Sequence, residues 1–242
     1  MIGLAGLPEL EEGDDLGRLL AEACGRAGGL EPGDVVVVAQ KAVSKVEGRV
    51  VRLDEVVPSQ RAVELAGDDG DPRQVEVILR ESAEVVRSRP PLVISRTRHG
   101  FVCASAGVDA SNAKGPGTVI LLPVDPDASA AALRDRLAEL TGVVPGVIVS
   151  DSFGRAWRQG TTDVALGVAG LAALRDLRGS RDGVGYELQS TMIAVADEIA
   201  GAAELVMGKT ANVPAAIVRG VESPGEGLAA ELVMPSERDL FP

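Results

Sequence analysis

Four consecutive valines, at positions 35–38, stand at the centre of the apolar stretch DVVVVAQ, residues 34–40. A continuous β-branched run of this kind predicts a strand that is buried on both faces. GVIV at 146–149 predicts a second such strand. The surrounding core must be aliphatic, because the chain holds only three Phe, one Trp and one Tyr. We therefore expect sheet and helix layers packed through Val, Leu, Ile and Ala.

The rest of the chain is predicted to be a mixture of helices and strands. Helical spacing of apolar residues indicates helices over 14–28, 72–87, 129–141 and 191–207, the third capped by Asp127 or Ser129. Further strands are expected at 92–95, 101–104, 119–122 and 215–220. Strands cluster between 92 and 122, so a regular doubly wound sheet is not indicated. We predict one domain over residues 1–242, with two subdomains as the alternative, and a polar terminal arm over 222–242.

The charge balance argues against nucleic acid as a partner. The formal net charge is −12, from 36 acidic and 24 basic residues, so a polyanion would be repelled on average. The first residues lack the basic and apolar regions of a signal peptide, and no apolar run reaches the roughly 18 residues of a membrane span. Two cysteines are too few for a disulfide framework. We expect a cytoplasmic protein without a membrane partner.

Several familiar motifs are incomplete. GKT at 208–210 lacks the first glycine of a P-loop, because Ala203 stands at that position. No G-x-S-x-G is present, which argues against a serine hydrolase. The lone histidine, His99, is therefore interpreted as structural rather than catalytic.

Carboxylates at predicted strand ends are the more specific signal. Asp109 follows the strand at 101–104, and Asp151 follows the strand at 146–149, with Ser152 and Asn112 beside them. Hard oxygen ligands of this kind suit Mg²⁺ or Mn²⁺. The alternative is that both aspartates only cap turns.

Basic and amide side chains follow the valine strand and the second buried strand. Gln40, Lys41, Lys45 and Arg49 can hold phosphate at a strand's carboxyl end, although they also fit a solvated turn. Arg155 and Arg158 can bind carboxylate or phosphate in forked geometry. For Trp157, which lies between these two arginines, we expect packing into the protein.

Six separated blocks, from about residue 2 to residue 220, resemble the coenzyme F420-0:gamma-glutamyl ligase family, in its form without the nitroreductase-like domain found in some members. The blocks are LPEL, GD-VVVVAQK-VSK-EGR, DPR-VE-IL-ES, TRHGFVCASAGVDASN, VSDSFGRAWR-G-TDVA-G and ADE-A-AAELVMGK. The resemblance implies an unusual α+β fold, with mixed, largely antiparallel sheets and packed helices, in an intertwined homodimer.

The resemblance also implies an activity and its site. The family uses GTP to join L-glutamate to the deazaflavin precursor coenzyme F420-0, and then adds further glutamates through gamma linkages. It requires Mg²⁺ or Mn²⁺, and K⁺ is often stimulatory. By motif, Asp109, Asp151 and Ser152 match the metal site. The matching guanine-nucleotide contacts are Leu7, Pro8, Glu9, Leu10, Gln40, Lys41, Lys45, Asn112, Met207, Gly208 and Lys209.

Amide formation from a carboxylate needs an activated acyl group, so we expect an acyl phosphate that the glutamate amine attacks. Positioning and charge neutralisation then carry the catalysis, with Asp151, Arg155 and Arg158 as the candidate catalytic residues. Two other classes share these features: a metal-dependent phosphohydrolase, and a non-catalytic guanine-nucleotide sensor.

Overall fold

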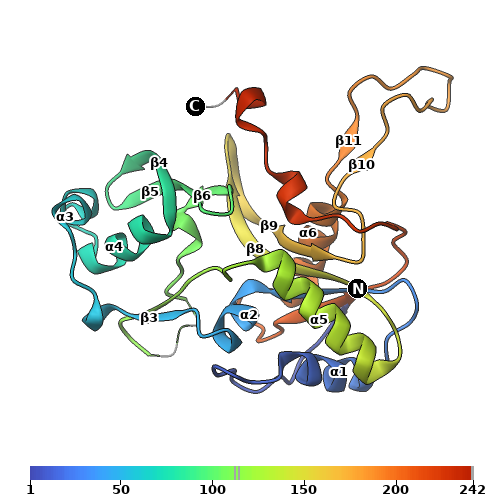
Figure 1. Cartoon of the computed structure of the whole chain (residues 1–242), viewed down its shortest axis with the longest axis horizontal. Coiled ribbons are helices and arrows are strands. Elements are labelled where there is room, and N and C mark those ends of the chain that lie inside the picture. Colours follow the sequence, from blue (N-terminus) through green and yellow to red (C-terminus); the bar gives the residue numbers. More distant parts are fainter. Residues whose placement is uncertain (112, 114, 241–242) are drawn as a thin grey trace.

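A five-stranded sheet forms the centre of the computed structural model, which describes residues 1–111, 113 and 115–240 (Figure 1). Strands β2 and β8 run parallel, and the other three neighbouring pairs run antiparallel. This arrangement confirms the predicted mixed, largely antiparallel α+β fold. The strand order is β1 (Ile2–Gly3), β12 (Ala215–Val218), β2 (Val35–Ala39), β8 (Gly146–Arg155) and β9 (Arg158–Ala169).

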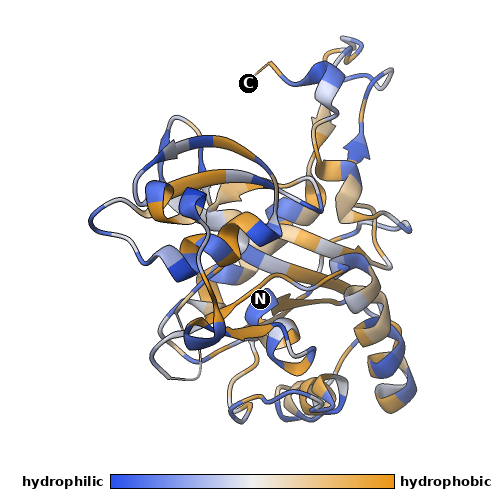
Figure 2. Ribbon diagram, turned by 60° about the vertical axis from the view of Figure 1, so that its left-hand side comes forward, coloured by the Kyte–Doolittle hydropathy of each residue, from blue (hydrophilic) through white to orange (hydrophobic). Residues whose placement is uncertain are grey.

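Different helices cover the two faces of this sheet, as the valine run predicts. Val36 and Val38 are buried against α1 (Leu16–Arg26), α2 (Gln40–Val46) and α5 (Pro126–Thr141). Val35 and Val37 point the other way and are buried against α6 (Val195–Met207). Successive side chains of a strand alternate between its faces, so one apolar run closes two cores. Figure 2 shows hydrophobic residues along the strands and on the helix faces that meet them.

A third buried cluster lies to one side of the main sheet, in residues 49–122, which we call the lobe (Figure 1). The chain enters and leaves the lobe at one place. The N–H of Leu121 donates to the carbonyl of Arg49, and Nε of Arg49 donates to the carbonyl of Leu122. Its elements are β3 (Val50–Arg52), α3 (Gln60–Ala66), α4 (Pro72–Glu81), β4 (Ser82–Arg89), β5 (Leu92–Thr97), β6 (Val102–Ala104) and β7 (Thr118–Ile120).

The predicted helix at 72–87 is wrong in its second half. Helix α4 ends at Glu81, and residues 82–89 form β4, which pairs antiparallel with β5. The Ser82 hydroxyl donates to the carbonyl of Ile78 where the helix ends. The apolar spacing of this stretch fits a helix, but pairing with β5 overrides that local pattern.

Other predicted boundaries also shift. The predicted strand at 146–149 continues to Arg155, because β9 supplies a partner along its whole length. The helix predicted at 191–207 begins at Val195, since residues 192–193 form β11 and pair with β10 (Arg175–Asp176). Helix α5 is capped by Asp125, rather than by Asp127 or Ser129, with proline at its first position.

The residues after β12 run back over the main body. Ala229 is fully buried, and its N–H donates to Oδ1 of Asp127, which also accepts the N–H of Val168 on β9. Two short 3-10 turns follow, at Ala229–Leu232 and Ser236–Arg238. Within the described part of the chain, every helix is too short or too polar to cross a lipid bilayer.

Candidate functional site

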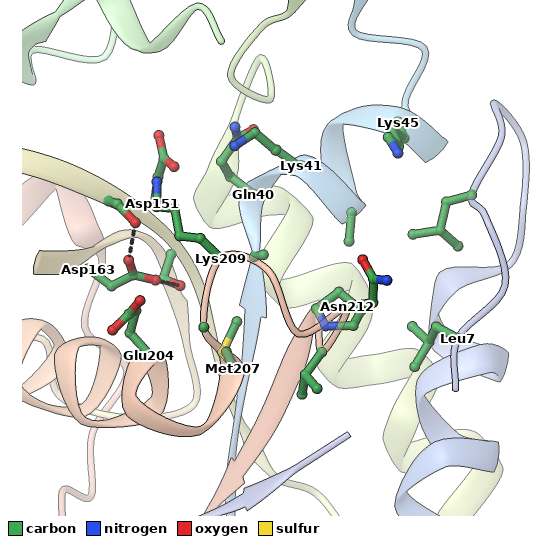
Figure 3. A pocket seen from close by; sticks show the side chains of 18 of the residues that line it. Leu7, Gln40, Lys41, Lys45, Asp151, Asp163, Glu204, Met207, Lys209 and Asn212 are labelled. Carbon is green, nitrogen blue, oxygen red and sulfur yellow. Dashed lines mark hydrogen bonds between the residues drawn. The ribbon is translucent and has the colours of Figure 1, made fainter. Parts of the chain in front are cut away.

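A cavity of about 680 Å³ lies where β2 ends and β8 continues alone with β9 (Figure 3). Strand β2 stops at Ala39, opposite Ser150, and helix α2 begins at the next residue. The carboxyl end of β2 and the part of β8 just beyond the parallel pairing therefore open onto one space, a common position for ligands in α/β sheets. The cavity is also lined by residues 7–10, Ala113, Asp163 of β9, the end of α6 at 204–207, and residues 208–214.

Most of the residues predicted for the site line this cavity. Asp109 is not a lining residue, but its Oδ2 lies 2.7 Å from Nζ of the lining residue Lys41. Arg155 and Arg158 lie at the exposed turn between β8 and β9, away from the cavity wall. Asn112 lies outside the described residues. The predicted residues that line the cavity are Leu7, Pro8, Glu9, Leu10, Gln40, Lys41, Lys45, Asp151, Ser152, Met207, Gly208 and Lys209.

Asp163 is a site residue that the sequence interpretation missed. The hairpin pairs it with Ser152, and its carboxylate accepts two hydroxyl hydrogen bonds, from Ser150 at 3.0 Å and from Ser152 at 2.5 Å. Ser152 therefore donates its hydroxyl hydrogen bond to Asp163, and its oxygen lone pairs stay available for a ligand. Other lining residues that the interpretation did not name include Glu204 and Asn212.

The two predicted metal-site carboxylates have different environments. Burial raises the pKa of Asp151 to about 6, and the positive charges of Lys41 and Lys209 only partly oppose this effect. Burial also acts to raise the pKa of Asp109, but hydrogen bonds from Lys41 and from the Ser111 N–H outweigh it, and the net pKa is lowered. Lys41 thus holds one carboxylate and lies within electrostatic reach of the other.

This donor set fits a hard divalent cation. Asp109, Asp151 and Ser152 offer two carboxylates and one hydroxyl, and Mg²⁺ and Mn²⁺ complete such a shell with water and phosphate oxygens. Asp109 already binds one positive charge, because the Lys41 ammonium lies 2.7 Å from its Oδ2. No cluster of three or more His, Cys, Asp or Glu in metal-binding arrangement occurs in residues 1–111, 113 and 115–240.

Gln40 places in the cavity lining a buried amide donor without a hydrogen-bond partner among the described residues. Its side chain is only 1% exposed, and its Oε1 accepts the Ser44 hydroxyl at 2.8 Å. Its Nε2 has no hydrogen-bond partner in the described structure. A buried amide donor without a partner costs free energy unless a ligand accepts from it. On the same helix as Gln40, Nζ of Lys45 lies 2.5 Å from Oε1 of Glu9.

Two residues singled out in the sequence lie elsewhere. Trp157 is 80% exposed at the turn of the β8–β9 hairpin, with φ of 57°, so the expectation that it packs inside the protein is wrong. The hairpin extends beyond the helix layers, so its turn has no core to enter. His99 stacks on Phe101, and its Nε2 lies 2.9 Å from the carbonyl oxygen of Pro123, which agrees with a structural role.

Comparison with known proteins points to one family. The profile of the F420-0:gamma-glutamyl ligase family matches residues 6–220. Proteins named coenzyme F420:L-glutamate ligase are similar over nearly their whole length. That of Methanopyrus kandleri is 48% identical over 240 residues, covering 96% of this chain and 93% of its own. That of Methanothermobacter thermautotrophicus is 44% identical over 247 residues, covering 100% and 98%. That of Archaeoglobus fulgidus is 44% identical over 238 residues, covering 98% and 93%.

Proposed function

This chain belongs to the F420-0:gamma-glutamyl ligase family, and we propose that it adds L-glutamate to coenzyme F420-0 at the expense of GTP. One observation carries the proposal. Residues 7–10, 40–41, 45, 151–152 and 207–209, which the family resemblance assigns to nucleotide and metal, line a single cavity of about 680 Å³. These segments are far apart in sequence, so their convergence supports one composite ligand site.

The chemistry proposed for this cavity begins with the substrate carboxylate. Transfer of the terminal phosphoryl group of GTP to that carboxylate would give an acyl phosphate and GDP. The glutamate amine would then form the amide and release phosphate. Such transfer depends on alignment and charge neutralisation rather than on a covalent nucleophile. Lys41 and Lys45 can contact phosphate oxygens, and the unpaired Nε2 of Gln40 can donate to the nucleotide.

A divalent cation fits the same scheme. Mg²⁺ or Mn²⁺, held by Asp109, Asp151 and Ser152, would offset the phosphate charge when bound. The protein as a whole carries a formal net charge of −12, so local positive charge must attract three anionic reactants. Lys41 and Lys45 supply that charge from α2, and Lys209 supplies it from the segment after α6 (Figure 3).

Product analysis tests this function. The protein is incubated with GTP, L-glutamate, F420-0 and Mg²⁺ or Mn²⁺, with and without K⁺, and the products are identified by mass spectrometry. We expect a glutamyl adduct of F420-0, with repeated release of GDP and phosphate only when both F420-0 and L-glutamate are present. GDP release in the absence of both F420-0 and L-glutamate would indicate a phosphohydrolase. GTP binding without any turnover would indicate a sensor.

We also propose that the protein is a homodimer. Strands β10 and β11 form an isolated two-stranded sheet that projects from the main body (Figure 1). Val184 is 91% exposed and Tyr186 is 63% exposed in the segment between them. Isolated hairpins are marginally stable in water, so a second chain that covers this one would stabilise it.

Light scattering at micromolar concentration should give twice the mass of the 242-residue chain. Replacement of Val184 and Tyr186 by serine should shift the equilibrium toward monomer. A monomeric wild-type protein would contradict the proposal.

A further inference from the structure

The proposed reaction, on which this inference rests, needs a group that takes a proton from the incoming amino acid. At neutral pH an amino-acid amine is largely an ammonium ion, and an ammonium has no lone pair to attack a carbonyl carbon. A carboxylate that faces the second substrate can both bind this cation and accept its proton. The question is which carboxylate of the cavity is available.

Of the four carboxylates that line the cavity, two are already engaged. Glu9 forms an ion pair with Lys45, at 2.5 Å. Asp163 accepts hydroxyl hydrogen bonds on both of its oxygens. A third, Asp151, belongs to the cation site together with Asp109. Each of these three therefore already has a hydrogen-bond partner, an ion-pair partner or a place in the proposed cation site.

Glu204 is the remaining lining carboxylate. Within the described residues its carboxylate forms no hydrogen bond and no ion pair, although the residue is partly buried. Its position follows from the packing of α6 on β9. A Cβ at Gly201 would lie 3.2 Å from the Thr162 hydroxyl oxygen, so the helix and the strand approach closely there. Glu204 stands one turn further along the same helix face.

The close-up view agrees with this placement. The Glu204 carboxylate points toward Asp163 in the cavity lining, and Lys209 and Asp151 lie beyond Asp163 on the same side of the cavity (Figure 3). Gln40 adds an independent sign of a polar ligand in the same cavity, since its 1%-exposed side chain has an unpartnered Nε2. An anionic side chain without a partner in such a space is a site for a cationic group of the ligand.

We propose that Glu204 binds the α-ammonium of the incoming L-glutamate and accepts one proton from it. The neutral amine then uses its lone pair to form the C–N bond at the acyl carbon. The bond from that carbon to the phosphate oxygen breaks, and phosphate leaves with the electron pair. The departing phosphate takes the second amine proton, and Glu204 returns its proton to solvent.

Glu204→Gln keeps the shape of the side chain and removes its charge, so it tests this role. We expect kcat/KM for L-glutamate to fall roughly 100-fold or more, while GTP affinity measured by calorimetry stays within about twofold of wild type. Glu198→Gln is the matched control, because Glu198 is an exposed glutamate on the same helix. This control should behave like wild type. Glu204→Asp, which keeps a carboxylate, should recover part of the lost rate.

Hydroxylamine separates proton acceptance from activation of the acyl group. It is a neutral amine at neutral pH, so it can trap the acyl phosphate as a hydroxamate without a proton acceptor. We expect Glu204→Gln to form the hydroxamate of F420-0 at close to the wild-type rate, with GDP release to match. Retained trapping together with lost glutamate ligation supports the proposal.

Other outcomes overturn it. Glutamate ligation at the wild-type rate in Glu204→Gln would show that the carboxylate is not needed. An equal loss of GTP binding would assign Glu204 to the nucleotide, and an equal loss of metal binding would assign it to the cation. An equal loss of hydroxamate formation would show that Glu204 is needed for activation of the acyl group or for the fold. A wild-type protein that forms neither the glutamyl product nor the hydroxamate would instead refute the proposed function itself.

Discussion

Asp34 and Asp151 lie at opposite ends of the central parallel pair of strands, and their pKa values are shifted in opposite directions. Asp34 directly precedes β2 and is fully buried. Its oxygens accept two hydrogen bonds from Arg219, each 2.8 Å long, and one from the Glu31 N–H. The Arg219 guanidinium accordingly holds the pKa of Asp34 below its usual value.

Asp151, at the other end, forms no ion pair with an arginine among the described residues. It lies just beyond the point where β2 stops, and burial raises its pKa to about 6. Asp34 therefore has an environment that stabilises its charge, as a structural ion pair does. Asp151 has one that destabilises its charge, as is frequent at functional sites. At Asp34 the arginine outweighs the effect of burial on the pKa, whereas at Asp151 burial outweighs the charges of the two lysines.

The largest expected effect is on turnover in Asp151→Asn. The substitution keeps the shape of the side chain and removes its charge, so cation-dependent ligation should fall by roughly 10²–10³-fold. The free protein should unfold at the same or a slightly higher temperature, because an unfavourable buried charge is removed. Product formation and thermal unfolding are measured on the same preparation. Near wild-type ligation, or collapse of the free protein, would make Asp151 a structural residue.

Asp34→Asn should reverse this pattern. It removes the charge that Arg219 neutralises, and the loss of charged hydrogen bonds should lower the free energy of unfolding by about 1–3 kcal/mol. Ligation by the folded variant should stay at the wild-type rate, because Asp34 does not line the cavity. Urea unfolding and the ligation assay together check both halves. A loss of turnover at unchanged stability would show that Asp34, like Asp151, acts in function rather than in structure.

The pH dependence of stability should follow Asp34. Its folded-state pKa is lowered, so its stabilising contribution is present above the unfolded value of about 3.9 and is lost as pH falls through the lower folded value. Stability of the wild type should therefore decline more steeply than that of Asp34→Asn as pH falls below about 5. Urea midpoints measured from neutral pH downward test this. If the urea midpoints of the two proteins fall in parallel with pH, the Asp34–Arg219 ion pair makes no pH-dependent contribution to stability.

The smallest expected effect is at Asp176, which also has an arginine partner but lies on the surface. Its ion pair with Arg178 is 2.5 Å long, and both side chains are about half exposed. The Arg178 hydrogen bonds lower the pKa of Asp176 to about 2. Water screens such a pair, so Asp176→Asn should leave the unfolding midpoint unchanged. A loss as large as that in Asp34→Asn would mean that pairing alone, without burial, determines stability.

The main sheet could be predicted from sequence because its signal is local. The valines at 35–38 have to be covered on both faces, and helices α1, α5 and α6 do so. The helix-to-strand change at Ser82 could not be predicted, since the apolar residues of 82–89 fit either periodicity and only pairing with β5 decides between them.

The site shows the same division between local and long-range signals. The strand-end argument placed Asp151 correctly beside the cavity, although the strand runs on through it. Asp163 was missed because its meeting with Ser152 depends on the register of a hairpin that contains a bulge near Gly154. Glu204 was missed because a glutamate near the end of an Ala-rich helix is ordinarily a solvated residue.

The meeting of the lobe's two ends at Arg49 bears on the order in which the molecule folds. During synthesis β2 emerges first, and its parallel neighbour β8 emerges only after the whole lobe. Closing so long a loop carries an entropic cost that a folded lobe would already have met. Once Leu121 and Leu122 are bonded to Arg49, the loop between the two strands is reduced to residues 40–48, with α2, and residues 123–145, with α5. We therefore expect the lobe to condense early, and the rate at which the central sheet assembles to follow the lobe's own stability.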